Sequence, residues 1–247
     1  MLHKPEAKVI LLATISLFIV TNVFAQHNAA DTLSSQKLLS YPVSLFHKAT
    51  ESQSHLFNGP QYVDYRKQNR DGHQYFFHDE VATGKVLYDG VVYANVPMLY
   101  DVVRDEVVIE MNGFLKQKLV SEKISEFNLH NRYFRRVIAQ DSTSLSTGFY
   151  DVLHNGNATD LLAKRRKVIE YVIEDNKELE KFISKDKFYI GKNKKFYLVN
   201  SKSSVLKVFS DKKKELKKFA RANKLQFRKA REAAILALVQ HYDSLTN

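Results

Sequence analysis

Residues 85–96 read KVLYDGVVYANV, and this stretch decides the class of fold. Two runs of Val, Leu and Tyr flank Asp89-Gly90, a dipeptide that favours the two-residue turn of a β-hairpin because it tolerates positive φ. Asn112-Gly113 gives a second signal of the same kind between two further apolar runs. Hairpins that follow one another in this way predict an antiparallel meander.

The same texture extends outward from this hairpin. Short segments rich in Tyr, Phe, Val and Ile alternate with turn signals, and residues 148–200 are expected to add two more hairpins, one of them turning at Gly191-Lys192-Asn193. Residues 161–172 remain open, because their spacing fits one face of a helix and also one face of a strand. We expect an antiparallel β domain over residues 56–200, built as a meander, a sandwich or an open barrel.

The pattern changes after residue 200. Ser203, Ser204 and Ser210 are candidate helix caps. Apolar residues then recur at helical spacing near the end of the chain, at Ile235, Leu238, Val239 and Tyr242. Residues 201–247 are therefore predicted to form a basic helical segment that packs on the β domain. The predicted fold class is α+β, with an antiparallel β-rich body and a C-terminal helical cap.

The first residues have the organisation of a secretory signal peptide. Lys4 and Lys8 precede an apolar run over residues 9–20, which is shorter than the about 20 residues that span a bilayer. Val23 and Ala25 occupy the two positions that a signal peptidase reads. We expect a signal peptide over residues 1–25, cleavage after Ala25, a flexible polar lead-in over residues 26–55 and no transmembrane helix in the mature chain.

Cysteine is absent from all 247 residues. An exported protein without disulfides depends on packing alone, and a secreted eukaryotic domain of this size would usually carry some disulfides. The composition therefore favours a bacterial envelope protein, located in the periplasm or on the periplasmic face of the outer membrane.

Positive charge is concentrated at one end of the chain. Residues 26–160 hold 13 basic and 16 acidic residues, whereas residues 161–247 hold 23 basic and 10 acidic residues. Such asymmetry indicates an anionic partner, and export argues against nucleic acid. We expect the partner to be an envelope protein or an anionic envelope component, with peripheral contact with the outer membrane. A solvated face that only aids solubility is the alternative.

Two sets of side chains are candidates for binding that partner. Lysines and arginines of the tail carry the positive field, and tyrosines of the β region offer aromatic faces of the kind that contact sugars and peptides. Strand propensity alone also explains the tyrosines. The candidates are Lys212, Lys213, Lys214, Lys217, Lys218 and Arg221 in the tail, and Tyr88, Tyr93 and Tyr100 in the β region.

No motif predicts catalytic residues, a cofactor or a metal site. His73 and His78 are five residues apart, so a strand would point them to opposite faces. The acidic residues between 101 and 110 lack the spacing of a calcium loop. The leading hypothesis is a non-catalytic envelope binding or assembly protein. One alternative is a hydrolase of envelope polymers that uses Asp or Glu as acid and base. The other is a peripheral binder of anionic lipid or lipopolysaccharide.

Several stretches resemble a family of uncharacterised exported proteins of Bacteroidetes-type bacteria, associated with the periplasm or the outer membrane. The similar stretches are residues 58–62, 72–76, 84–97 and 148–153, together with the lysine-rich tail. The resemblance covers most of residues 56–245. It implies an envelope location, a β-rich body and a strand at residues 161–172. It implies no activity and no catalytic residue.

The signal-peptide assignment predicts that the exported protein begins at Gln26. N-terminal sequencing of the protein recovered from a Gram-negative periplasm checks this. Ala25→Phe places a bulky ring at the cleavage position and is expected to block processing, whereas Ala29→Phe leaves it intact. An exported chain that still carries residues 1–25 would contradict the assignment.

Overall fold

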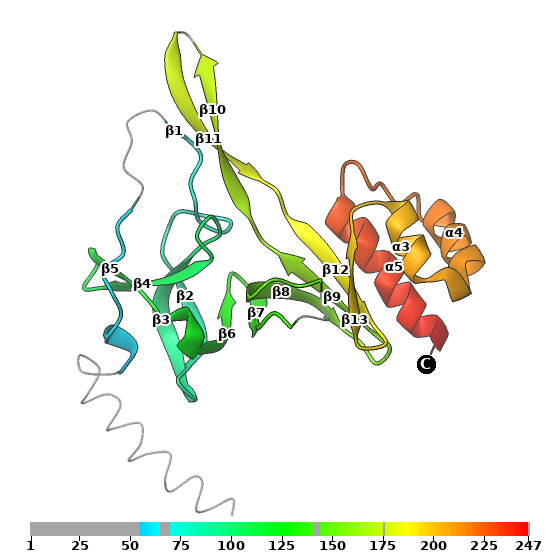
Figure 1. The fold of residues 1–247 in the computed structure, drawn as a ribbon, viewed down its shortest axis with the longest axis horizontal. Helices are drawn as coiled ribbons and strands as arrows, with labels where there is room; N and C mark the ends of the chain where they lie inside the picture. Colours follow the sequence, from blue (N-terminus) through cyan, green and yellow to red (C-terminus); the bar gives the residue numbers. More distant parts are fainter. Residues whose placement is uncertain (1–54, 65–69, 141–143, 175, 247) are drawn as a thin grey trace, which may run out of the picture. The chain divides into compact units, whose positions relative to one another are not determined.

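The computed structural model describes residues 55–64, 70–140, 144–174 and 176–246 (Figure 1). The predicted signal peptide and nearly all of the predicted lead-in, residues 26–55, lie outside the described residues. Within the described ranges, no helix is both long enough and apolar enough to cross a membrane.

A ten-stranded antiparallel sheet forms the body of the protein and confirms the predicted β-rich architecture. Its strand order is β13-β12-β9-β8-β7-β6-β2-β3-β4-β5, and it stays open because β13 and β5 do not pair with each other. Its strands are β2 (Ala82–Tyr88), β3 (Val91–Asp101), β4 (Glu106–Met111), β5 (Leu115–Lys118), β6 (Ile124–Leu129), β7 (Arg132–Val137), β8 (Gly148–Asn155), β9 (Thr159–Lys164), β12 (Lys187–Lys192) and β13 (Lys195–Val199). Short 3-10 turns lie at η2 (His55–Phe57) and η3 (Ser121–Lys123).

The β2–β3 hairpin forms as its turn chemistry predicts. Tyr88 pairs with Val91, and between them Asp89 and Gly90 have φ values of 51° and 78°. Both values are positive, which is the requirement of this turn type. Position 84 requires glycine, because a Cβ there would lie 2.6 Å from the carbonyl oxygen of Asn128.

Aromatic rings fill the main core on one side of the sheet. Phe127 and Phe134 stack with centroids 4.6 Å apart, and Tyr100 meets both rings edge-on. Phe149 closes the group against Phe127 and Tyr100. All four rings are almost fully buried, so they contribute strongly to the hydrophobic stabilisation of the sheet.

A second, three-stranded sheet settles the segment that the sequence leaves open. Its order is β1-β11-β10, with β1 (Arg70–Asp71), β11 (Lys177–Ser184) and β10 (Lys167–Glu174). Residues 161–172 are therefore extended, as the resemblance implies. They are divided between β9 and β10 by Arg165 and Arg166, which belong to neither strand.

The C-terminal segment is helical and packs on the sheet, which confirms the α+β class. Its helices are α3 (Lys202–Val208), α4 (Lys213–Ala222) and α5 (Arg231–Thr246), with a 3-10 turn η4 (Ser210–Lys212) before α4. The N-cap of α3 is Ser201, and Ser204 completes a capping box with it. A second core joins helices and sheet, with Leu161, Ile190 and Val199 facing Val205 and Leu238.

The aromatic core predicts a large difference between two phenylalanines. Phe134→Ala removes a fully buried ring and should lower the free energy of unfolding by about 3–5 kcal/mol. Phe114→Ala changes a side chain that is 80% exposed and should have an effect within about 0.5 kcal/mol. Urea denaturation followed by circular dichroism measures both. Equal losses in the two variants would contradict the described core.

Candidate partner-binding surface

Helix α4 carries five of the twelve basic residues of the helical cap, residues 201–247. Its apolar stripe is narrow: Leu216 and Ala220 are buried, and Phe219 stacks on His241 of α5 with ring centroids 3.9 Å apart. The helix packs on α3 and α5 (Figure 1), whereas α3 and α5 themselves contact the strands. The remaining faces of α4 are therefore available to solvent.

Five of the predicted tail residues share these solvent faces. Lys213, Lys217 and Arg221 are spaced by four residues, so they lie along one side of the helix. Lys214 and Lys218 form a neighbouring row, and all five side chains are exposed. We call this set the basic face. Lys212, the sixth predicted residue, ends η4 and is half-buried.

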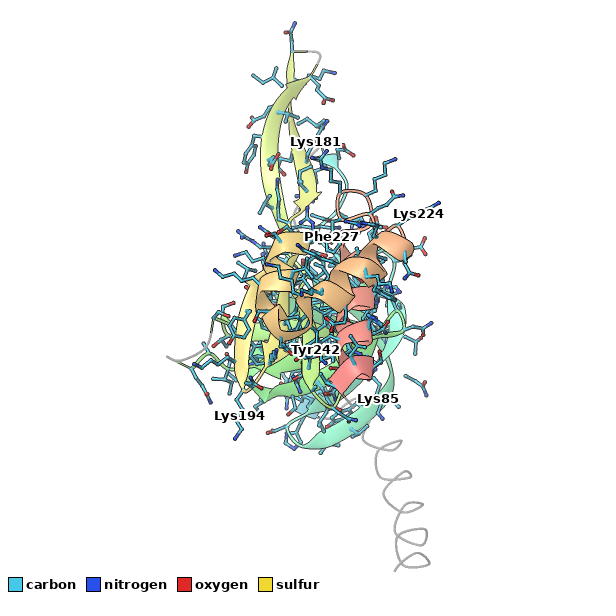
Figure 2. The ribbon with its side chains drawn as sticks, turned by 90° about the vertical axis from the view of Figure 1, so that its right-hand side faces the viewer. Lys85, Lys181, Lys194, Lys224, Phe227 and Tyr242 are labelled. Carbon is cyan, nitrogen blue, oxygen red and sulfur yellow. The ribbon has the colours of Figure 1, made fainter. Side chains whose placement is uncertain are left out.

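Further cations continue the basic face along the link between α4 and α5. The link runs past Lys224 and Phe227, which Figure 2 labels beside the helices. Leu225 and Phe227 pack partly against the helical core. The basic side chains around them are all exposed, at Lys224, Arg228, Lys229 and Arg231.

Within the described ranges, these cations have no protein partner to neutralise them. Residues 212–231 contain ten basic residues and one acidic residue, Glu215. Among the residues that the structure describes, none of these ten side chains forms an ion pair or a side-chain hydrogen bond. Like charges spaced by four residues on a helix destabilise it by a few tenths of a kcal/mol. The arrangement therefore costs stability and leaves the positive field open to a partner.

The predicted tyrosines lie in a different place. Tyr88 and Tyr100 are 1% and 0% exposed, so neither ring is available at the surface. The hydroxyl of Tyr100 donates to Asp105 Oδ1 at 2.5 Å, and burial raises the pKa of Tyr100 well above its ordinary value. Tyr93 keeps partial exposure. The structure does not bring these tyrosines together with the basic face, and core packing accounts for Tyr88 and Tyr100.

A buried ionic network ties the helical cap to the sheet, and the sequence gives no signal of it. Arg165 is 7% exposed, and its guanidinium donates to Asp151 at 2.5 and 2.9 Å, to Asp186 at 2.7 Å and to Glu232 at 2.6 Å. Arg132 adds a second contact to Glu232 at 2.9 Å. Asp151 of β8, Asp186 before β12 and Glu232 in the first turn of α5 thus meet at one guanidinium.

The protonation of this network follows from burial and pairing. Burial alone would raise the pKa of Glu232, but hydrogen bonds and charge from Arg165 and Arg132 hold it below its ordinary value. Burial raises the pKa of Asp151, and the charges of Arg165 and Arg132 only partly oppose this rise. Both carboxylates are paired with arginine side chains, and these ion pairs anchor the cap on the sheet.

The acidic residues at 101–110 are likewise used inside the fold. Asp101 accepts hydrogen bonds from the Tyr62 hydroxyl at 2.8 Å and from the backbone N–H of Val103 and Arg104. Burial raises the pKa of Asp101, and these hydrogen bonds lower it in part. Asp105 contacts Lys164 at 2.5 Å. These carboxylates hold loops and strands in place.

A shallow hollow lies between residues 156–160 and the β12–β13 turn. It encloses about 150 Å³ and is lined by Lys192, Lys194, Lys195 and one carboxylate, Asp160. Lys192 is already committed to Asp211 at 2.7 Å. A pair of converging carboxylates, which acid–base hydrolysis requires, does not line this hollow.

The contrast between structural and solvent-facing cations predicts unequal effects when each is replaced by Met. Arg165→Met removes the only side chain that donates hydrogen bonds to Asp151 among the described residues and leaves this buried carboxyl with Arg132 alone, 3.8 Å away, so it should lower the free energy of unfolding by about 3–5 kcal/mol. Lys217→Met removes an exposed cation and should change it by less than about 0.5 kcal/mol. Chemical denaturation of both variants checks this. An Arg165→Met variant with an unchanged free energy of unfolding would contradict the anchoring role.

No protein-family model, no curated protein and no solved structure matches the chain. The inference about function therefore rests on the basic face and its surroundings.

Proposed function

We propose that the protein is a non-catalytic protein of the bacterial envelope that binds an anionic partner through the basic face. The exposed cations on α4 and the following link, which have no ion-pair partner in the part of the chain that the structure describes, carry this proposal. The envelope location rests on the signal-peptide pattern and on the absence of cysteine.

The packing of α4 supports a binding role. Leu216 and Ala220 fix the helix on a core shared with α3 and α5, so its charges are displayed from an ordered element. Cations on an ordered helix lose less conformational freedom when they bind than cations on an unstructured tail. Other basic residues, led by Arg165, already provide the ionic contacts that hold the cap on the sheet.

The chemistry of the basic face favours phosphate-rich surfaces such as anionic lipid or lipopolysaccharide. Its exposed positions carry charged groups, and Leu216 and Ala220 of α4 are buried. Binding would then be mainly electrostatic, without deep insertion into the hydrocarbon region. Each Lys or Arg near an anionic membrane surface contributes about 1 kcal/mol, and the attraction weakens as salt rises.

Vesicle co-sedimentation tests the proposal. The full chain should bind vesicles that contain anionic phospholipid or lipopolysaccharide, and it should be released at high salt. The triple variant Lys213→Gln, Lys217→Gln and Arg221→Gln removes three cations from one side of α4. It should lose about 3 kcal/mol of binding free energy, a decrease of roughly 150-fold in affinity.

A charge-matched variant separates the basic face from overall net charge. Lys85, Lys177 and Lys187 are exposed lysines outside the helical cap, and none forms an ion pair among the described residues. Replacing these three with Gln lowers the net charge by the same amount and should leave most of the binding. Equal losses in both triple variants, or equal binding to neutral vesicles, would contradict the proposal.

A further inference from the structure

Strand β10 is an edge strand with unusual composition. It reads KVIEYVIE over Lys167–Glu174 and pairs on one side with β11. On its other side it pairs with no strand of the described chain. An edge rich in Val, Ile and Tyr is a template for pairing with another strand.

The backbone of β10 offers hydrogen-bonding groups along that edge. The N–H of Lys167 donates to the carbonyl of Val102 at 3.4 Å, so it points away from β11. In an antiparallel strand, alternate residues direct their N–H and C=O groups to the same side. The groups of Ile169, Tyr171 and Ile173 therefore also point toward the open edge.

The side chains of these residues share one face of the sheet and are poorly covered. Ile169 is half-buried, Tyr171 is 58% exposed and Ile173 is 81% exposed. Their cross-strand partners on β11 are Phe182, Glu180 and Glu178. A ribbon of so few strands, with both faces partly in solvent, is marginally stable by itself. An additional strand would cover the two exposed side chains and complete the edge.

The sequence of β10 is complementary to itself in one register. Two antiparallel copies related by a two-fold axis through Tyr171 would place Tyr171 opposite Tyr171 of the second copy. Ile169 would then lie opposite Ile173 of that copy, and Glu170 opposite its Val172. This register joins apolar residues along the exposed face and sets no like charges directly opposite each other.

The two neighbouring registers are unfavourable. An axis through Glu170 would place two copies of Glu170 opposite each other. An axis through Val172 would place Glu170 opposite Glu174. Like charges directly opposite in a sheet are destabilising. The glutamates therefore disfavour both neighbouring registers relative to the register centred on Tyr171.

We propose that two copies of this chain associate by antiparallel pairing of β10 with β10, centred on Tyr171. The three strands β1, β11 and β10 of each copy would form one continuous sheet. The basic face lies on α4, outside this contact, so the association is independent of the proposed anion binding.

Charge pairs at the axis test the proposal on the full-length protein. Sedimentation velocity should give twice the mass of one chain for the unmodified protein at micromolar concentration. Tyr171→Lys and Tyr171→Glu should each be monomeric, because like charges would meet at the two-fold axis. An equimolar mixture of the two variants should recover the dimer, because Lys then faces Glu.

Matched controls separate pairing from folding. Tyr197→Lys changes a tyrosine that is 40% exposed on β13, the edge of the other sheet, and should leave the dimer intact. Far-UV circular dichroism checks that each variant folds. If the charged variants fail to fold, oxidation of Tyr171→Cys replaces them, since the chain has no other cysteine. It should give a disulfide-linked dimer that Tyr197→Cys does not give.

Three outcomes would overturn the proposal. The first is an unmodified protein that is monomeric throughout the micromolar range. The second is a dimer that persists in both charged variants, which would place the contact elsewhere. The third is a mixture of folded Lys and Glu variants that stays monomeric, or a folded Tyr171→Cys protein that forms no crosslink.

Discussion

The buried guanidinium of Arg165 is the interaction on which the arrangement of cap and sheet depends. It lies directly after β9, where the chain leaves the ten-stranded sheet for β10, and it contacts Asp151, Asp186 and Glu232 together. Asp186 precedes β12, where the chain returns to the sheet. The side chain of Arg165 therefore joins both ends of the β10–β11 hairpin to the start of α5. A guanidinium suits this role because its planar group of donors reaches several carboxylates at once.

The basic residues of the C-terminal third thus divide into two populations. Arg165 and Lys164 are enclosed and paired, and Lys192 joins the sheet to the helices through Asp211. The cations of α4 and the following link are exposed and lack such partners among the described residues. The first population accounts for structural ionic contacts, and the second remains available for a ligand. Net charge alone does not distinguish the two.

Structure that depends on neighbouring residues, such as a hairpin turn, was predictable from the sequence. Contacts between residues far apart in the chain were not. The turn at Asp89-Gly90 follows from the residues that form it. The turn expected at Gly191-Lys192-Asn193 is instead at Asn193-Lys194, since Lys192 pairs with Lys195. Gly191 lies within β12, where a Cβ would be 2.9 Å from the ring of Phe196. The Arg165 network has no local signature, since Arg165 and Glu232 are 67 residues apart. Tyr88 and Tyr100 were candidates for binding, with strand propensity as the alternative explanation, and only the packing of the sheet assigns them to the core.

The position of β2 between β3 and β6 bears on how the chain folds. The β2–β3 hairpin closes through neighbouring residues, but the outer edge of β2 pairs with β6, so that Val86 meets Phe127. This pairing requires closure of a long loop, which slows folding and leaves an apolar strand edge open in the meantime. An unfinished chain that ends before β6 would carry that open edge into solution. With this topology, the edge of β2 must therefore be kept from pairing with other chains until β6 has been made and has joined it.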